Sequence, residues 1–269
     1  MKKILWKPDS KKETKMAELT AIINHNHDQK INNYEQLHNW SVNHIPEFWE
    51  EIWNYCDILH SESYAQVVDD VKFMPGAKWF TGAKLNFAEN LLRFRDDRVA
   101  IKFKSEDKSL RELTYLELFH EVEKVSSYLK ELGVQKGDRV VGFLPNIPEA
   151  VAAMLATSSL GAVWSSCSPD FGTKGVLDRF SQIEPKVIFS SYGYRYNGKY
   201  YDSLKKLNGV LKELPTVQKI ILIDNHNSDE INPKFEFISY NKILESTPNP
   251  IRFVQLPFDH PLYIMYSSG

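Results

Sequence analysis

The sequence RVVGFLPNIPEAVAAMLATSSLGAVWS, residues 139–165, decides the fold of this chain. Its first part, residues 139–144, is an apolar run that is typical of a buried strand. A turn signal follows, and Pro148 suits the first turn of an alanine-rich helix that we expect to end before Gly161. Residues 162–165 predict a second strand. The stretch therefore encodes one strand–helix–strand unit.

The same alternation continues on both sides of this unit. Upstream, residues 99–114 predict a β-hairpin around a charged turn, and Thr114-Tyr-Leu-Glu117 is a capping-box sequence that opens a helix. Downstream, residues 186–190 and 217–223 predict further strands separated by helices. Strands that alternate with helices in this way favour a mostly parallel sheet with helices on both faces. We therefore predict an α/β fold for residues 98–269.

Residues 1–97 differ in character and predict an N-terminal extension of helices and loops. They hold five of the six tryptophans and show little strand pattern. Short helices are expected between residues 16 and 53, and their aromatic stripe indicates core packing. Asn86 is expected to cap one more short helix, with Glu89 at the reciprocal capping position.

The composition excludes several classes of function. The chain has 269 residues, 42% of them hydrophobic and 25% charged, which is ordinary for a globular protein. A formal net charge of −2 gives no support for a nucleic-acid partner. No run approaches the ~18 apolar residues of a membrane span, and the N-terminus lacks a signal-peptide core. Two distant cysteines are typical of a reducing compartment, so we expect a cytoplasmic protein.

Candidate ligand-binding residues follow the predicted strands, because ligands of open α/β sheets lie beyond the carboxyl ends of the strands. Small or polar residues, which also suit ordinary turns, occur at Pro145-Asn146, Ser165–Ser168 and Ser190-Ser191. Within residues 191–199, SYGYRYNGK, the cations Arg195 and Lys199 lie among glycines and tyrosines. This mixture suits a phosphate clamp with a stacked base, and it also suits a surface loop.

Two other candidates have structural interpretations. Cys167 has no base beside it in the sequence, so we predict a structural thiol rather than a nucleophile. His25 and His27 lack a third ligand at suitable spacing, so we predict a solvated loop there and no metal site.

The C-terminal residues 261–269, PLYIMYSSG, predict a phosphate-holding loop. Residues 262–266 are expected to form a buried strand that breaks into Ser267, Ser268 and Gly269. Glycine lets the main chain approach a ligand closely, and hydroxyls and N–H groups can face phosphate oxygens. Because a domain rarely ends at such a point, we expect the chain to be cut inside its own functional loop.

Taken together, these motifs resemble those of the acetyl-CoA-synthetase branch of the adenylate-forming enzymes, and within it the acetoacetyl-CoA synthetases most. The resemblance covers essentially the whole chain, including its tryptophan-rich start. The segments that carry it, in order, are residues 73–92, 144–146, 161–172, 193–199 and 261–269.

The resemblance implies an AMP-forming acid–thiol ligase. ATP and acetoacetate would give an acyl-adenylate and pyrophosphate, and the CoA thiol would then displace AMP. Ser267, Ser268 and Gly269 would begin the loop that holds the ATP phosphates with Mg²⁺. Arg195 and Lys199 would meet the phosphates of CoA. The catalytic lysine, the adenine-binding motif and the mobile C-terminal domain would all lie beyond Gly269, so no catalytic residue is assigned and the chain alone is expected to be inactive.

Two alternatives stay open at this point. One is a ligase of the same class for acetate, propionate or another short acid, because the residues that select the acid would lie downstream. The other is a non-catalytic module that binds CoA or a protein partner. A continuation past Gly269 with Thr-Thr-Gly-x-Pro-Lys would favour the ligase.

Overall fold

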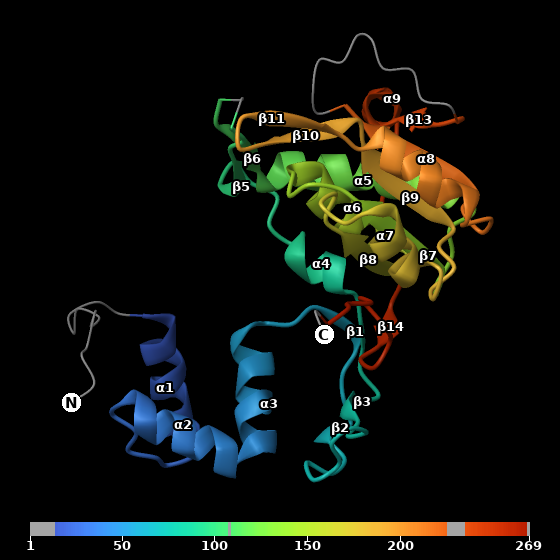
Figure 1. Ribbon diagram of the computed structural model, residues 1–269. Helices are drawn as coiled ribbons and strands as arrows, with labels where there is room; N and C mark the ends of the chain where they lie inside the picture. Colours follow the sequence, from blue (N-terminus) through green and yellow to red (C-terminus); the bar gives the residue numbers. More distant parts are fainter. Residues whose placement is uncertain (1–13, 107–108, 225–234, 268–269) are drawn as a thin grey trace, which may run out of the picture. The chain divides into compact units, whose positions relative to one another are not determined.

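The computed structural model describes residues 14–106, 109–224 and 235–267, and these form two compact units. The first unit comprises the chain up to Lys84 together with Pro257–Asp259, and the second comprises Leu85–Leu256 and the residues from His260. Figure 1 labels the helices and strands of the chain. The boundary between residues 97 and 98 that the composition suggests stays a prediction.

The first unit begins with three helices and continues with short strands. Their bounds are α1 Lys15–Asn26, α2 Tyr34–Asn43, α3 Ile45–Tyr55, β1 His60–Glu62, β2 Gln66–Val68, β3 Trp79–Thr81 and β4 Lys84–Leu85. The predicted helices are confirmed, and the antiparallel pair β2–β3 lies in a region for which only loop was expected.

Apolar side chains from α1, α2 and the loop between them hold the helical part together. The cluster consists of Leu19, Ile23, Ile31, Leu37 and Trp40, with Phe48, Ile52 and Tyr55 packed against it. The prediction of a solvated loop at His27 is wrong. Its ring lies 5.0 Å from the Trp40 ring, and its Nε2 lies 3.0 Å from the Oε1 of Glu51, which is buried.

The second unit contains the predicted α/β fold. Its elements are α4 Phe87–Leu91, β5 Val99–Phe103, β6 Arg111–Thr114, α5 Tyr115–Glu131, β7 Arg139–Phe143, α6 Pro148–Ser159, β8 Val163–Cys167, α7 Thr173–Phe180, β9 Val187–Ser191, β10 Gly193–Tyr196, β11 Lys199–Asp202, α8 Leu204–Lys212, β12 Lys219–Ile223, β13 Ile238–Ser239, α9 Tyr240–Glu245 and β14 Leu256–Pro257.

The central sheet of this unit is parallel, with the strand order β13-β12-β9-β7-β8. Residues along each strand alternate between two apolar cores. Val140 of β7 belongs to the core shared with α5, α6 and α9, whereas Val141 belongs to the core shared with α7 and α8. Phe189 and Ile188 of β9 divide in the same way. Helices therefore cover both faces of the sheet, as predicted (Figure 1).

Local capping signals in the sequence are also confirmed. Thr114 and Glu117 form the reciprocal capping box of α5. Asn86 caps α4 by accepting from the N–H groups of Ala88 and Glu89. The reciprocal role predicted for Glu89 is wrong, because its carboxylate accepts a hydrogen bond from the Gln255 side chain at 2.8 Å.

Within the described residues, no helix has the length and apolar character needed to cross a membrane.

Candidate functional site

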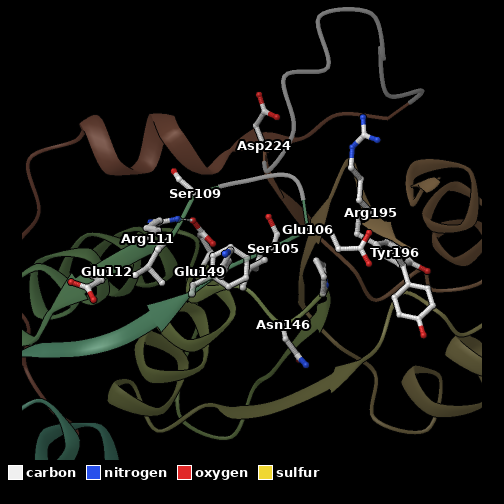
Figure 2. A pocket seen from close by; sticks show the side chains of 16 residues that line it. Ser105, Glu106, Ser109, Arg111, Glu112, Asn146, Glu149, Arg195, Tyr196 and Asp224 are labelled. Carbon is white, nitrogen blue, oxygen red and sulfur yellow. Dashed lines mark hydrogen bonds and ion pairs between the residues drawn. The ribbon is translucent and has the colours of Figure 1, made fainter. Parts of the chain in front are cut away.

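A cavity of about 980 Å³ opens in the second unit at the carboxyl ends of β7 and β12 (Figure 2). The chain passes from β7 to β8 on one side and returns to β9 on the other, so the strand order reverses at β7. Ligands of open α/β sheets bind at such reversal points, in cavities of about 300–1,000 Å³. The lining consists of Phe103–Glu106, Ser109–Glu112, Pro145–Ile147, Glu149, Tyr194–Tyr196 and Asp224.

One wall of the cavity comes from the β10–β11 hairpin, a pairing that the sequence analysis missed. The two strands are antiparallel and are joined by Asn197 and Gly198, whose φ angles are +50° and +71°. Positive φ at both central residues is the requirement of a type I′ turn, and Asn-Gly is its preferred sequence. The segment that resembled a loop is therefore a tight hairpin that rises from the end of β9.

The hairpin register separates the two cations that the sequence singled out. Arg195 pairs with Tyr200, whereas Lys199 pairs with Tyr196. Because successive residues of a strand point to opposite faces, Arg195 and Lys199 lie on opposite faces of the hairpin. Arg195 lines the cavity, and Lys199 is absent from the described residues that line it.

The Arg195 face of the hairpin carries charged and aromatic groups within electrostatic reach of one another. Burial raises the pKa of Tyr200, the negative charges of Asp202 and Asp224 raise it further, and the positive charge of Arg195 opposes them. The Arg195 side chain is exposed, and its guanidinium projects from the hairpin (Figure 2). A guanidinium can bind a phosphate through two parallel hydrogen bonds, and aromatic rings beside it can stack on a base.

The opposite face of the hairpin is fixed to the body of the unit. The rings of Tyr194 and Tyr201 stack with centroids 5.3 Å apart, and the Tyr194 hydroxyl donates to Asp170 at 2.5 Å. Burial and this hydrogen bond to a carboxylate raise the pKa of Tyr194 well above its ordinary value. These tyrosines therefore serve as an anchor for the hairpin.

Another wall holds an ion pair that joins β6 to α6. Arg111 Nη1 lies 2.5 Å from Glu149 Oε1, and Arg111 Nη2 lies 4.0 Å from Glu121 Oε2. The buried Tyr240 hydroxyl donates to Glu121 at 2.7 Å. Burial raises the pKa of Glu121, and the nearby Glu149 charge raises it further. Sequence reasoning missed this group because its members come from separate elements and share no local motif.

The serines predicted to follow the strands are mostly part of the strands. Ser165 and Ser166 lie within β8, and Ser190 and Ser191 lie within β9. The Ser165 hydroxyl donates to the Ile264 carbonyl at 2.8 Å, and the Ser190 hydroxyl donates to the Phe143 carbonyl at 3.1 Å. These hydroxyls therefore bind the main chain of neighbouring segments.

Cys167 ends β8 in a buried position. It is 4% exposed, and burial raises the pKa of its thiol to about 11, with the positive charge of Arg179 opposing the shift. A thiol with so high a pKa carries little thiolate at neutral pH, so the geometry favours a structural role.

The C-terminal segment differs from the predicted buried strand. It makes one parallel bridge, between Tyr263 and Trp164 of the edge strand β8, and Met265 is 83% exposed. The prediction of a buried strand was wrong. Within the described residues the segment pairs on one side, through main-chain hydrogen bonds of 3.1 Å and 2.9 Å to Trp164. Ser267 is exposed, and the predicted loop residues Ser268 and Gly269 lie outside the described residues.

The described residues also contain no group of three or more His, Cys, Asp or Glu side chains arranged to hold a metal ion.

Comparisons with known proteins agree along the whole chain. The family model "AMP-binding enzyme" matches residues 87–269, and "Acetyl-coenzyme A synthetase N-terminus" matches residues 34–91. An acetoacetyl-CoA synthetase from Danio rerio is 44% identical over 99% of this chain and 41% of its own length. A malonamoyl-CoA synthetase from Penicillium aethiopicum is 36% identical over 99% of this chain and 39% of its own length.

A solved structure shows the same fold. The acetoacetyl-CoA synthetase from Streptomyces lividans superposes with a TM-score of 0.91 at 39% identity, covering 98% of this chain and 41% of that protein. The chain thus spans about 41% of the length of these acetoacetyl-CoA synthetases. Because one family model matches more than half of its residues, the chain belongs to the AMP-binding enzyme family.

Proposed function

We propose that this chain is the N-terminal portion of an ATP-dependent ligase that joins acetoacetate to CoA and forms AMP. The observation that carries the proposal is the similarity along the whole chain to acetoacetyl-CoA synthetases of 40–44% identity. Family membership supports the reaction type, and the relatives' names support acetoacetate as the acid. The activity belongs to a longer polypeptide that continues past Gly269 and includes a mobile C-terminal domain.

The reaction has two steps, adenylation of the acid and transfer of the acyl group to CoA. A carboxylate oxygen attacks the α-phosphorus of ATP, pyrophosphate leaves, and an acyl-adenylate remains. The sulfur of CoA then attacks the acyl carbon, and AMP leaves with the electron pair of the broken C–O bond. The adenylate makes the acyl group reactive because AMP is a far better leaving group than an oxide ion.

We assign the start of the ATP phosphate loop to Ser267, Ser268 and Gly269. A loop of this composition would offer main-chain N–H groups and hydroxyls to the β- and γ-phosphates. Mg²⁺ enters the proposal as the ion bound to ATP.

We assign the anionic nucleotide end of CoA to the Arg195 face of the β10–β11 hairpin. Arg195 lines the cavity, and its cross-strand partner Tyr200 shares its face of the hairpin, which supports phosphate binding and base stacking on this face. Lys199 lies on the opposite face and is proposed as a secondary contact that reaches CoA around the exposed tip of the hairpin.

We expect the enzyme to work in the cytoplasm. Cys56 and Cys167 are both thiols rather than a disulfide, which supports a reducing compartment.

An acid panel tests the proposal. The full-length gene product and the polypeptide of residues 1–269 are each assayed with ATP, CoA and acetoacetate, acetate, propionate or malonamate, and acyl-CoA and AMP are quantified. We expect the highest kcat/KM with acetoacetate for the full-length protein and no turnover for residues 1–269. A higher kcat/KM with another acid would overturn the substrate assignment. Near-enzyme rates from residues 1–269 would overturn the assignment of the catalytic residues to a later part of the chain.

A further inference from the structure

The turn of the β10–β11 hairpin is held by a carboxylate from a distant part of the chain. Glu106 follows β5 and lines the cavity. Its Oε1 accepts from the Asn197 N–H at 2.7 Å, and its Oε2 accepts from the Gly198 N–H at 2.9 Å. One carboxylate thus accepts two consecutive main-chain hydrogen bonds from the two central residues of the turn.

These two hydrogen bonds fix the free end of the hairpin. At the other end the Tyr194 hydroxyl donates to Asp170, so the β10–β11 hairpin has a fixed contact on each side of Arg195. A two-stranded hairpin is marginally stable by itself, so its tip depends on such external contacts. Arg195 lies two residues before Asn197, and its direction follows that of the turn.

We infer that Glu106 is a positioning residue for CoA, which it serves by holding the Arg195 face of the hairpin in the orientation that meets the anionic end of the ligand. The inference rests on the proposed CoA site. A guanidinium held in place loses less conformational freedom on binding, and this preorganisation is what raises affinity. Glu106 itself is not expected to touch CoA, because a carboxylate repels phosphate.

The negative charge of Glu106 could also affect CoA binding directly, and the two effects predict opposite changes in affinity. If Glu106 acted only through its charge, Glu106→Gln would remove a negative charge near the ligand and tighten CoA binding. If it holds the turn, the same change weakens both hydrogen bonds and loosens CoA binding. Glu112→Gln is the matched control. Glu112 also lines the cavity, lies on β6, which pairs with β5 just before Glu106, and forms an ion pair with Lys102 at 2.8 Å. This substitution removes the same charge and leaves the turn contacts in place.

The experiment compares wild type, Glu106→Gln, Glu112→Gln and Arg195→Ala in the 269-residue chain. CoA affinity is measured by calorimetric titration, and hydrogen exchange by mass spectrometry follows the peptide that contains Asn197 and Gly198. We expect Glu106→Gln to raise the Kd for CoA about tenfold, or about 1.4 kcal/mol, and to accelerate exchange in the turn. Glu112→Gln should leave the exchange rate of the turn as in the wild type, and any change it makes in the Kd measures the effect of removing a cavity-lining carboxylate that does not hold the turn.

The outcomes separate this inference from the proposed function. The positioning role of Glu106 is overturned if Glu106→Gln leaves hydrogen exchange in the turn unchanged, or if its Kd for CoA stays equal or falls. In that case weaker CoA binding by Arg195→Ala still supports the proposed CoA site. If the wild type fails to bind CoA, the proposed site fails as well, and the exchange data alone then decide whether Glu106 holds the turn.

Discussion

Gly193 at the start of β10 provides a severe test of the hairpin geometry. A Cβ atom added at this position would lie 2.4 Å from the Tyr200 hydroxyl oxygen and 2.4 Å from the Tyr201 carbonyl oxygen. These atoms would have to separate by about 1 Å to reach an ordinary contact distance of about 3.5 Å. The Tyr200 side chain can rotate away. The Tyr201 oxygen belongs to the main chain of the paired strand, so it moves only if the hairpin opens.

The expected cost of Gly193→Ala follows from this crowding. Overpacking a well-packed site typically costs 1–3 kcal/mol, and main-chain atoms on one side place this site at the upper end, about 3 kcal/mol. That corresponds to a change of about 150-fold in the equilibrium between closed and open hairpin. Neither described apolar core of the second unit includes residues 193–202, so the global free energy of unfolding should change less than the local opening.

Two measurements report on the opening separately. Hydrogen exchange by mass spectrometry follows the peptide that spans residues 193–202, and calorimetric titration gives the Kd for CoA. Gly172→Ala is the control, because nothing lies within 4 Å of its added Cβ and its φ of −70° suits any residue. We expect faster hairpin exchange and a Kd raised at least tenfold in Gly193→Ala, with both values near wild type in Gly172→Ala. If Gly193→Ala keeps the exchange and the Kd of the wild type, the crowding argument is wrong.

Three further predictions concern the scaffold that supports the site. Asn86 is 1% exposed, and its side chain donates to three carbonyls, including that of Val254 at 2.8 Å. Asn86→Ala should therefore lower the free energy of unfolding, measured in urea, by about 3–4 kcal/mol. A loss below about 1 kcal/mol would contradict the importance of these hydrogen bonds. Thr114→Ala breaks the capping box of α5 and should lower the free energy of unfolding in urea by about 1 kcal/mol. Thr114→Ser keeps a capping hydroxyl and should retain most of that free energy. Burial raises the folded-state pKa of Glu121 above its ordinary 4.5, so its contribution to stability is fully present below that pH and is lost as the pH rises through the folded pKa. Between pH 4 and 8 the unfolding free energy of the wild type should therefore fall relative to that of Glu121→Gln, by at most about 1.4 kcal/mol per pH unit. A difference that does not change with pH would refute the raised pKa.

The fold could be predicted from the sequence because its signals are local. The apolar run at residues 139–144, the helix that follows Pro148 and the capping box at Thr114 each involve neighbours along the chain. Periodicity and end signals of this kind depend on a few consecutive residues. The same holds for Asn86, whose capping role was visible, although its bonds to distant carbonyls were not.

The site was predicted less completely because its geometry depends on register and on distant partners. The composition around Arg195 pointed to a segment that lines the cavity. Asn197-Gly198 is a strong hairpin signal, and with it the opposite faces of Arg195 and Lys199 could have been derived from the sequence. By contrast, the contacts of Glu106 with the turn span more than ninety positions and leave no local pattern.

The C-terminal segment shows the other limit of a periodicity argument. Its run of apolar residues favoured a buried strand, but burial of a strand also requires elements packed over the faces to which its side chains point. Among the described residues the segment bridges β8 alone, and Met265 is exposed. An apolar run thus predicts a tendency to pair, and the partners decide whether the strand is buried.

A calorimetric titration of CoA into the 269-residue chain and its Arg195→Ala and Lys199→Ala variants tests the proposed CoA site directly. A charged hydrogen bond to phosphate contributes about 1.5–3 kcal/mol, so Arg195→Ala should raise the Kd at least tenfold. Lys199→Ala should raise it less than threefold, because Lys199 lies on the face opposite Arg195. Saturable binding that weakens in this order is the predicted result. A wild-type chain that does not bind CoA, or an Arg195→Ala variant with the wild-type Kd, would contradict the central claim.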